Sequence, residues 1–226
     1  DNHIAVIKAL ASKRQGLTRQ QIISTAKLPS GSLVSRVLDE LLSSGFIMAF
    51  RPFGKKKKEK LYRLTDEYSL FYLNFIEGKE YEGDDIWNLL SQTQLYKTWS
   101  GYAFENICLK HIAQIKKAIG ISGIYSLSGS FYKKGTAAEK GAQIDLLIDR
   151  NDHVINLFEV KFYNEPYTIT KDYAAKLREK MSIFRNTSKT KKQLFWVFIS
   201  TFGVLENQYS GSIIAKFLTM DNLFET

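Results

Sequence analysis

The sequence is poor in residues that crosslink small proteins through disulfides or metal ions. Its 226 residues include one cysteine, Cys108, so no disulfide can form within the chain. The three histidines, His3, His111 and His153, are scattered, so a structural zinc site is not expected. Only three prolines and little low-complexity sequence are present, which argues against long disordered segments.

Long apolar runs are also missing. No run approaches the roughly 20 residues that a membrane-spanning helix requires. The first residues, DNHIAVIKAL, lack the basic and then apolar order of a signal peptide. Together with the single cysteine, these absences predict a cytoplasmic protein that makes no membrane contact.

Positive charge is abundant. The net charge is +9, and both the first 83 residues and the remainder carry more Lys and Arg than Asp and Glu. A basic chain suits a polyanionic partner such as DNA, although many soluble proteins are basic without such a partner. The length allows one large domain or two small ones, and nothing in the composition indicates an oligomeric state.

The first 65 residues predict three helices and two strands. Apolar residues recur at helical spacing in DNHIAVIKAL, RQQIISTAK and LVSRVLDELLSSG. Thr18 with Gln21 three residues later forms a capping box before the second helix. The β-like runs FIMAFRPF and LYRLT then flank the lysine-rich loop GKKKKEK.

This order of elements resembles a winged helix-turn-helix over about residues 3–65. In that fold the third helix enters the major groove of DNA and the wing contacts the backbone. The resemblance implies nucleic-acid-binding residues on the third helix and on the wing: Ser32, Ser35, Arg36, Arg51, Lys55, Lys56, Lys57 and Lys58. The lysine run suits phosphate contact, and the third helix is poor in residues that read bases. A protein-packing module with a solvated lysine turn is the alternative.

A domain boundary is expected near residue 80. The aromatic segment DEYSLFYLNFI predicts a helix with Thr65 or Asp66 as its N-cap. The charged, glycine-containing stretch EGKEYEGDD follows it. We therefore expect a winged-helix domain with its aromatic helix over residues 1–80, and a second domain over residues 81–226.

The second domain predicts an α/β fold. A long helix is expected from about Gln92 to Ala118, and a second helix begins at Thr170. Three strands lie between the helices, at GIYSLSGSFY, QIDLLID and VINLFEVKF, and two more follow, at QLFWVFIS and IIAKFLT. The order α, β, β, β, α, β predicts a sheet covered by helices.

Three charged residues stand out in the apolar strands, namely Asp145, Glu159 and Lys161. Unpaired charges buried in a sheet are costly, so a common explanation is needed. Asp145 lies opposite Glu159 only when paired positions add up to 304, which leaves residues 151–153 as a three-residue loop. The cluster therefore predicts an odd loop or a bulge in this hairpin.

Two neighbouring carboxylates suit a hard cation such as Mg²⁺, or Mn²⁺ in its place. Lys161 beside the cation could act on a water molecule or stabilise charge on a phosphate. Glu105, in the apolar stretch YAFENICLKHI, is a further candidate. A plain salt bridge between Glu159 and Lys161 is the bland alternative, but it leaves Asp145 unexplained.

The pattern Ile144-Asp145 followed by Glu159-Val160-Lys161 resembles the PD-(D/E)XK nuclease superfamily, whose core order is αβββαβ. The resemblance implies that Asp145, Glu159 and the Val160 carbonyl bind Mg²⁺ with help from Glu105. It also implies that Asp145, Glu159 and Lys161 are catalytic. Ile144 stands where the motif has proline.

A winged helix followed by a nuclease-like domain resembles the C-terminal portion of a family of prokaryotic P-loop ATPases. The resemblance implies an N-terminal ATPase part of the same polypeptide that is missing here. No G-x-x-x-x-G-K-[ST] occurs in the sequence, so no ATP site is expected in these residues. The expected function is that of a DNA-associated region with a Mg²⁺-dependent deoxyribonuclease site. The alternative is an inactive DNA-binding or assembly module that keeps the nuclease fold.

Overall fold

The computed structural model describes residues 2–55, 59–81, 85–137 and 139–225. It is a mixed α/β structure that divides into two compact units. Unit 1 comprises residues 1–51 and 55–106, and unit 2 comprises residues 52–54 and 107–226. The division falls between Asn106 and Ile107, whereas the sequence predicted a boundary after residue 80.

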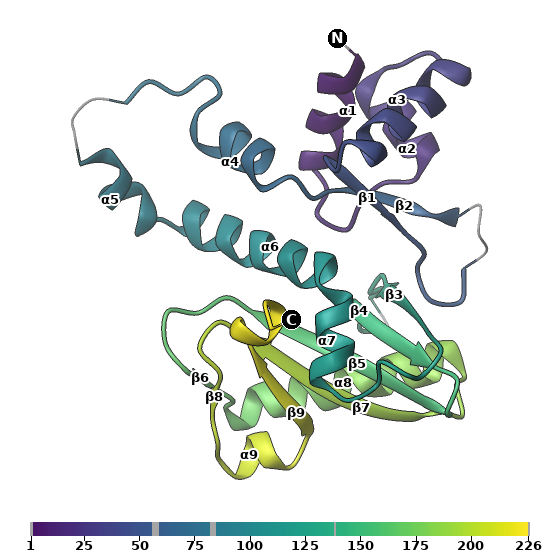
Figure 1. Ribbon diagram of the computed structural model, residues 1–226, viewed down its shortest axis with the longest axis vertical. Helices are drawn as coiled ribbons and strands as arrows, with labels where there is room; N and C mark the ends of the chain where they lie inside the picture. Colours follow the sequence, from purple (N-terminus) through teal and green to yellow (C-terminus); the bar gives the residue numbers. More distant parts are fainter. Residues whose placement is uncertain (1, 56–58, 82–84, 138, 226) are drawn as a thin grey trace. The chain divides into compact units, whose positions relative to one another are not determined.

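Unit 1 begins with three helices and a two-stranded antiparallel sheet, in the order that the sequence predicted (Figure 1). These elements are α1 (Asn2–Ala11), α2 (Arg19–Ala26), α3 (Ser32–Ser43), β1 (Ile47–Phe50) and β2 (Leu61–Leu64). Three further helices follow, namely α4 (Glu67–Phe75), α5 (Ile86–Ser91) and α6 (Gln94–Lys110), the last of which continues past the division.

Local sequence explains how α2 is positioned. The side chain of Thr18 accepts a hydrogen bond from the Gln21 backbone N–H, and the Gln21 side chain accepts one from the Thr18 backbone N–H, which confirms the predicted capping box. Gly16 precedes it with a φ of +81°. A Cβ at Gly16 would lie 2.7 Å from the carbonyl oxygen of Tyr62, so this tight approach to β2 requires glycine.

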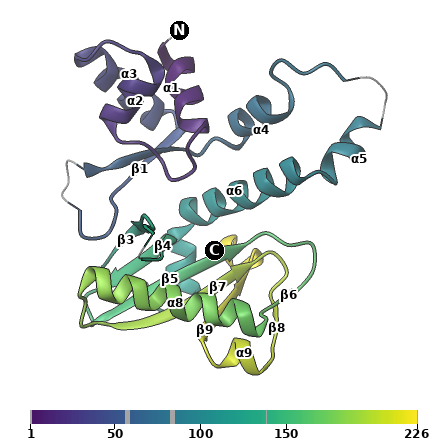
Figure 2. The same cartoon turned by 180° about the vertical axis from the view of Figure 1, so that it is seen from behind.

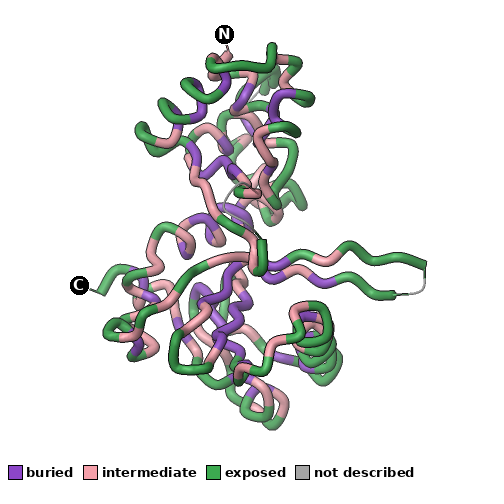
Figure 3. Tube along the Cα trace, turned by 90° about the vertical axis from the view of Figure 1, so that its right-hand side faces the viewer, coloured by how far each residue is buried: buried purple, intermediate pink, exposed green. Residues whose placement is uncertain are grey.

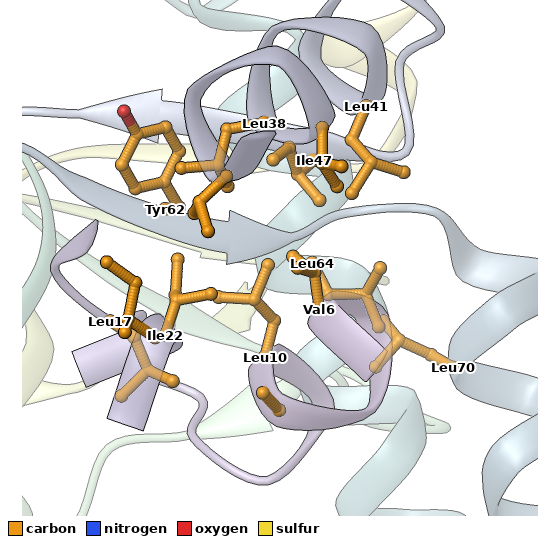
Figure 4. Packing of buried hydrophobic residues seen from close by; sticks show 14 of the residues in the cluster. Val6, Leu10, Leu17, Ile22, Leu38, Leu41, Ile47, Tyr62, Leu64 and Leu70 are labelled. Carbon is orange, nitrogen blue, oxygen red and sulfur yellow. The ribbon is translucent and has the colours of Figure 1, made fainter. Parts of the chain in front are cut away.

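Apolar side chains from the helices and the sheet of unit 1 share one core. Figure 4 shows Val6 and Leu10 of α1 lying with Leu38 of α3 and with Tyr62 and Leu64 of β2. All five are at most 5% exposed. The helical stripes predicted from the sequence therefore face the two-stranded sheet.

Aromatic packing accounts for the position of the division. Phe75 of α4 contacts Trp87 of α5 and Trp99 of α6, with ring centroids 5.9 and 5.7 Å apart. Phe71 contacts both tryptophans as well, and Tyr96 contacts them from α6. These contacts join residues on both sides of position 80, so the charged stretch there is a connection within unit 1.

Unit 2 contains a five-stranded mixed sheet in the order β3-β4-β5-β7-β9. Its strands are β3 (Ser126–Lys133), β4 (Ala142–Arg150), β5 (Val154–Lys161), β7 (Gln193–Ser200) and β9 (Ile214–Thr219). A small parallel sheet pairs β6 (Tyr167–Thr168) with β8 (Val204–Leu205). The remaining elements are α7 (Ile112–Ala118), α8 (Lys171–Ser188), α9 (Gln208–Gly211) and the 3-10 helix η2 (Asp221–Leu223).

The sheet has an antiparallel half and a parallel half. β3, β4 and β5 pair antiparallel, whereas β5, β7 and β9 run parallel. Helix α8 connects β5 to β7 and lies on one face of the sheet, and α7 lies on the other face (Figures 1 and 2). The carboxyl ends of β5 and β7 therefore meet at the same edge, where Lys161 pairs with Ser200.

One hydrophobic core cluster of unit 2 lies between the sheet and α8. Figure 3 shows buried residues along the strands and exposed residues on the outward turns of the helices. Leu177 and Phe184 of α8 are fully buried against Leu157 and Trp196 of the sheet. Thr170 caps α8 by accepting a hydrogen bond from the Tyr173 backbone, at the position where the sequence predicted that this helix begins.

The prediction of a single helix from Gln92 to Ala118 is wrong. The structure has α5 ending at Ser91, α6 beginning at Gln94 and a break at His111 between α6 and α7. The ring of His111 bonds the Ile107 carbonyl at 2.8 Å, so the side chain competes for an acceptor of the helix backbone.

Candidate functional site

Glu159 is the centre of a polar cluster on the α8 face of the sheet. Its side chain is 8% exposed, and each carboxylate oxygen forms an ion pair with one ammonium group. Lys161 Nζ lies 3.1 Å from Oε1, and Lys180 Nζ of α8 lies 2.8 Å from Oε2. The hydroxyl of Tyr173 donates to Oε1 at 2.5 Å. The strand and the helix therefore place two cations and one hydroxyl on a single carboxylate.

These partners keep Glu159 ionised. Burial alone would raise the pKa of Glu159, but Lys161 and Lys180 outweigh it and hold the pKa below its usual value. A buried carboxylate is tolerated in a core when charged partners and hydrogen bonds satisfy it. The cluster therefore carries one buried negative charge and two positive charges that reach the surface.

Two tyrosines complete the cluster. Burial raises the pKa of Tyr173, and the negative charge of Glu159 raises it further, so Tyr173 remains a hydrogen-bond donor. Tyr167 packs against Tyr173 with ring centroids 5.6 Å apart, and burial also raises the pKa of Tyr167. The ammonium group of Lys161 lies 5.5 Å from the Tyr173 ring centroid, within range of a cation–π interaction.

The register that the sequence predicted for the hairpin is confirmed. β4 and β5 pair from Leu146 with Phe158 to Asp149 with Ile155, and each pair of positions adds up to 304. Residues 151–153 form the turn, in which His153 has a φ of 63°. Asp145 is the next position of β4 beyond this ladder, and Glu159 is the next position of β5.

A bulge in β4 changes the expected orientation of Asp145. The register between β3 and β4 shifts between Gly129–Leu147 and Phe131–Ile144, so Asp145 and Leu146 together oppose one residue of β3. Strict alternation placed Asp145 on the same face as Leu147, but Ile144 and Leu147 both belong to the core under α8. Alternation therefore does not fix the direction of Asp145, which accepts a hydrogen bond from Gln143 at 2.6 Å.

The fit of these residues to a metal ion is partial. Across the ranges described above, no three His, Cys, Asp or Glu side chains are grouped so that they could hold a cation. Asp145, Glu159 and the Val160 carbonyl offer three oxygen ligands on adjacent strands, which is enough for Mg²⁺ when water and phosphate complete its shell. However, each oxygen of the Glu159 carboxylate forms an ion pair in the structure, one with Lys161 and the other with Lys180.

Glu105 has a different partner from the one expected. Its Oε2 lies 2.9 Å from Arg63 of β2, in an ion pair within unit 1. Asp145 and Glu159 belong to unit 2. A role for Glu105 at a metal therefore stays a prediction.

The expected DNA-contacting residues of α3 are exposed. Ser32, Ser35 and Arg36 all lie on the surface of that helix. Arg36 pairs with Glu40 at 3.7 Å, and Ser35 accepts a hydrogen bond from Arg19 of α2 at 3.3 Å. Arg19 was not among the nucleic-acid-binding residues that the sequence predicted.

The segment between β1 and β2 is basic where it is described. Arg51 and Lys55 are exposed, and Lys55 pairs with Glu59 at 3.5 Å. The predicted contacts of Lys56, Lys57 and Lys58 lie outside the described residues. Lys60, which the sequence reasoning omitted, lines a shallow pocket with Ala49, Phe50 and Arg51.

The sequence indicated that Lys180 is a solvated helix charge, able to face a phosphate if the helix flanks the site, and that Tyr173 is a core residue. The two positions are seven residues apart on α8, so they lie on one face of the helix two turns apart. That face also carries the apolar residue Leu177. A tyrosine and a lysine on the sheet-facing side of the helix were the available signal.

Comparisons with protein-family models, with curated proteins and with solved structures found no match to this chain. In the described ranges, every helix is too short or too polar to cross a bilayer.

Proposed function

We propose that unit 2 hydrolyses phosphodiester bonds in DNA at the Glu159 cluster, with Mg²⁺ as cofactor. The observation that carries this proposal is the buried Glu159 carboxylate with Lys161 beside it at the carboxyl end of β5. When the two-residue strand β6 before α8 is set aside, the element order α7-β3-β4-β5-α8-β7 follows the αβββαβ order of the PD-(D/E)XK nucleases, which supports the same interpretation. Asp145 on β4 and Glu159 on β5 each lie one position beyond the last residue pair of the β4–β5 ladder.

In this proposal Asp145, Glu159 and the Val160 carbonyl would hold the cation, with Lys180 displaced from Glu159. The cation would supply charge neutralisation at the phosphate and a more acidic water. The water oxygen forms a bond to phosphorus, the bond to the leaving sugar oxygen breaks, and one water proton ends on that oxygen. Lys161 stabilises the negative charge that develops on the phosphate.

Unit 1 would supply binding to DNA in the manner of a winged helix. Ser32, Ser35 and Arg36 would lie on the groove-facing helix, and Arg51 and Lys55 would contact phosphates. The exposure of all five residues supports this assignment. We further propose that the chain works as the C-terminal portion of a prokaryotic P-loop ATPase, with the ATPase part in the same polypeptide.

The test of the enzyme is incubation with plasmid, linear and single-stranded DNA in the presence of Mg²⁺ or Mn²⁺. Wild type is compared with Lys161→Ala and with Lys176→Ala, which removes an exposed lysine from α8. Cleavage that Lys161→Ala abolishes and Lys176→Ala retains supports the proposal. Calorimetry of Mn²⁺ binding to wild type and Glu159→Gln provides a second readout that does not depend on turnover.

A specific observation favours a second candidate, a DNA-binding or assembly module without catalysis. Glu159 is already neutralised by Lys161 and Lys180, an arrangement that holds the fold together without a cation. This candidate predicts no cleavage by any variant and no Mn²⁺ binding. It retains DNA binding that weakens with salt, and Arg51→Ala with Lys55→Ala would reduce the salt dependence.

A further inference from the structure

Two exposed aromatic side chains lie at the edge of the sheet where the Glu159 cluster ends. Tyr163 is 46% exposed and Phe202 is 59% exposed. We refer to these two residues as the edge aromatics. Lys161 pairs with Ser200 at the ends of β5 and β7, and each edge aromatic follows one member of that pair by two residues. Both residues therefore follow the strand ends at the edge that carries Lys161.

The surrounding structure holds the two segments in place. The backbone N–H of Tyr163 donates to Oγ1 of Thr201 at 2.8 Å, which ties the chain after β5 to the chain after β7. The Tyr163 ring meets Tyr167 edge to face, with centroids 5.5 Å apart. Tyr167 in turn packs on Phe198 of β7 at 5.2 Å. Tyr163 is thus positioned by its neighbours while much of its side chain stays exposed.

Aromatic rings exposed beside cationic groups favour a ligand that is both apolar and anionic. Lys161 and Lys180 are about one-third exposed, and the chain carries a net charge of +9. Unpaired nucleotides offer a base that stacks on an aromatic ring and a phosphate that meets an ammonium group. In a duplex the base faces are covered by neighbouring bases, so rings of this kind cannot reach them.

We propose that the edge aromatics stack on unpaired bases, so that the site takes single-stranded or frayed DNA and not intact duplex. This inference rests on the proposed function for its substrate class, and it names the form of DNA that the site binds. Tyr163 and Phe202 are binding residues in this proposal and take no part in the chemistry.

The test is fluorescence anisotropy with a labelled 20-nucleotide strand and with the duplex of the same sequence, in EDTA so that no cleavage occurs. Tyr163→Ala and Phe202→Ala should each weaken single-strand binding about tenfold, because base–aromatic stacking has this magnitude. Tyr163→Phe should bind as wild type does, since the ring is kept. Tyr125→Ala is the matched control, because Tyr125 is an aromatic residue that is 72% exposed at the other end of the sheet. It precedes Ser126, which pairs with Arg150.

The outcomes separate this inference from the proposed function. Unchanged single-strand affinity in both alanine variants overturns the inference, and so does an equal loss for single strand and duplex. Wild type could instead self-associate through the edge aromatics. If Tyr163→Ala abolishes self-association and leaves the single-strand affinity unchanged, the edge aromatics bind a second copy of the chain and the inference is overturned. Absence of cleavage by wild type contradicts only the proposed enzyme, because the binding experiment contains no divalent cation. Circular dichroism of each variant shows that it is folded.

Discussion

The guanidinium group of Arg63 lies 2.9 Å from the carboxylate of Glu105, and this ion pair joins β2 to α6 within unit 1. The Arg63 side chain is 3% exposed and also lies over the ring of Tyr102, 4.2 Å from its centroid. Beside the pair, the side chain of Asn106 donates to the Leu64 carbonyl at 3.2 Å. A buried cation, a carboxylate and an amide thus attach α6 to the strand.

Removing Glu105 should destabilise unit 1 because the Arg63 charge would stay buried without its carboxylate. We expect Glu105→Ala to lower the free energy of unfolding by about 2 kcal/mol, less than for a fully buried pair because Glu105 is 26% exposed. Urea unfolding measures this change. Glu77→Ala is the control, since its pair with Lys8 is exposed on both sides and should contribute under about 0.5 kcal/mol. Equal losses in the two variants would contradict the prediction.

Lys180 should contribute more to stability than its neighbour Lys176. Lys180→Ala removes one of two cations from the buried Glu159, whereas Lys176 is exposed on the same helix. We expect Lys180→Ala to cost about 1 kcal/mol, after allowance for its partial exposure, and Lys176→Ala to cost close to nothing. Thermal and urea unfolding of the two variants provide the comparison. The prediction fails if Lys176→Ala is the more destabilising change.

The turn between β4 and β5 should tolerate glycine and reject a β-branched residue at position 153. His153 has a φ of 63°, in the left-handed region that costs an L-residue about 1 kcal/mol or more. We expect His153→Gly to leave the stability unchanged or to raise it by about 0.5 kcal/mol, and His153→Val to lower it. Chemical unfolding at equilibrium tests both. A valine variant as stable as the glycine variant would show that the turn adopts another conformation in solution.

The aromatic cluster of α4, α5 and α6 predicts where unit 1 is vulnerable. Phe75 is 2% exposed, so Phe75→Ala should cost about 3–5 kcal/mol through lost burial and a cavity. Trp87 is 43% exposed, and Trp87→Ala should cost clearly less. Near-ultraviolet circular dichroism and urea unfolding follow the two variants. A larger loss for Trp87→Ala would contradict the packing described here.

Local chemistry made a large part of the fold predictable from the sequence. The capping box at Thr18, the start of a helix at Thr170 and the hairpin register depend on neighbours in the chain, and the structure confirms all three. The register followed from the expectation that Asp145 and Glu159 lie opposite each other, which requires a three-residue loop after Arg150. The order of helices and strands was predictable because apolar periodicity differs between helix and strand.

Other features depend on contacts between distant segments, and the sequence alone could not supply them. The domain boundary was placed at a charged stretch, because nothing local indicates that Trp87 and Trp99 pack on Phe75. The contact of Lys180 with Glu159 joins residues 21 positions apart and requires the position of α8 over the sheet. The bulge at Asp145 is set by the pairing of β4 with β3, which the pattern of β4 does not reveal.

The bulge in β4 also affects which substitutions the strand can accept. Ile144 and Leu147 both fill the core, and the two residues between them oppose a single residue of β3. The strand therefore accommodates Asp145 as an addition and loses no apolar side chain from the core. Replacement of this carboxylate would alter the polar chemistry of the strand and leave Ile144 and Leu147 in the core.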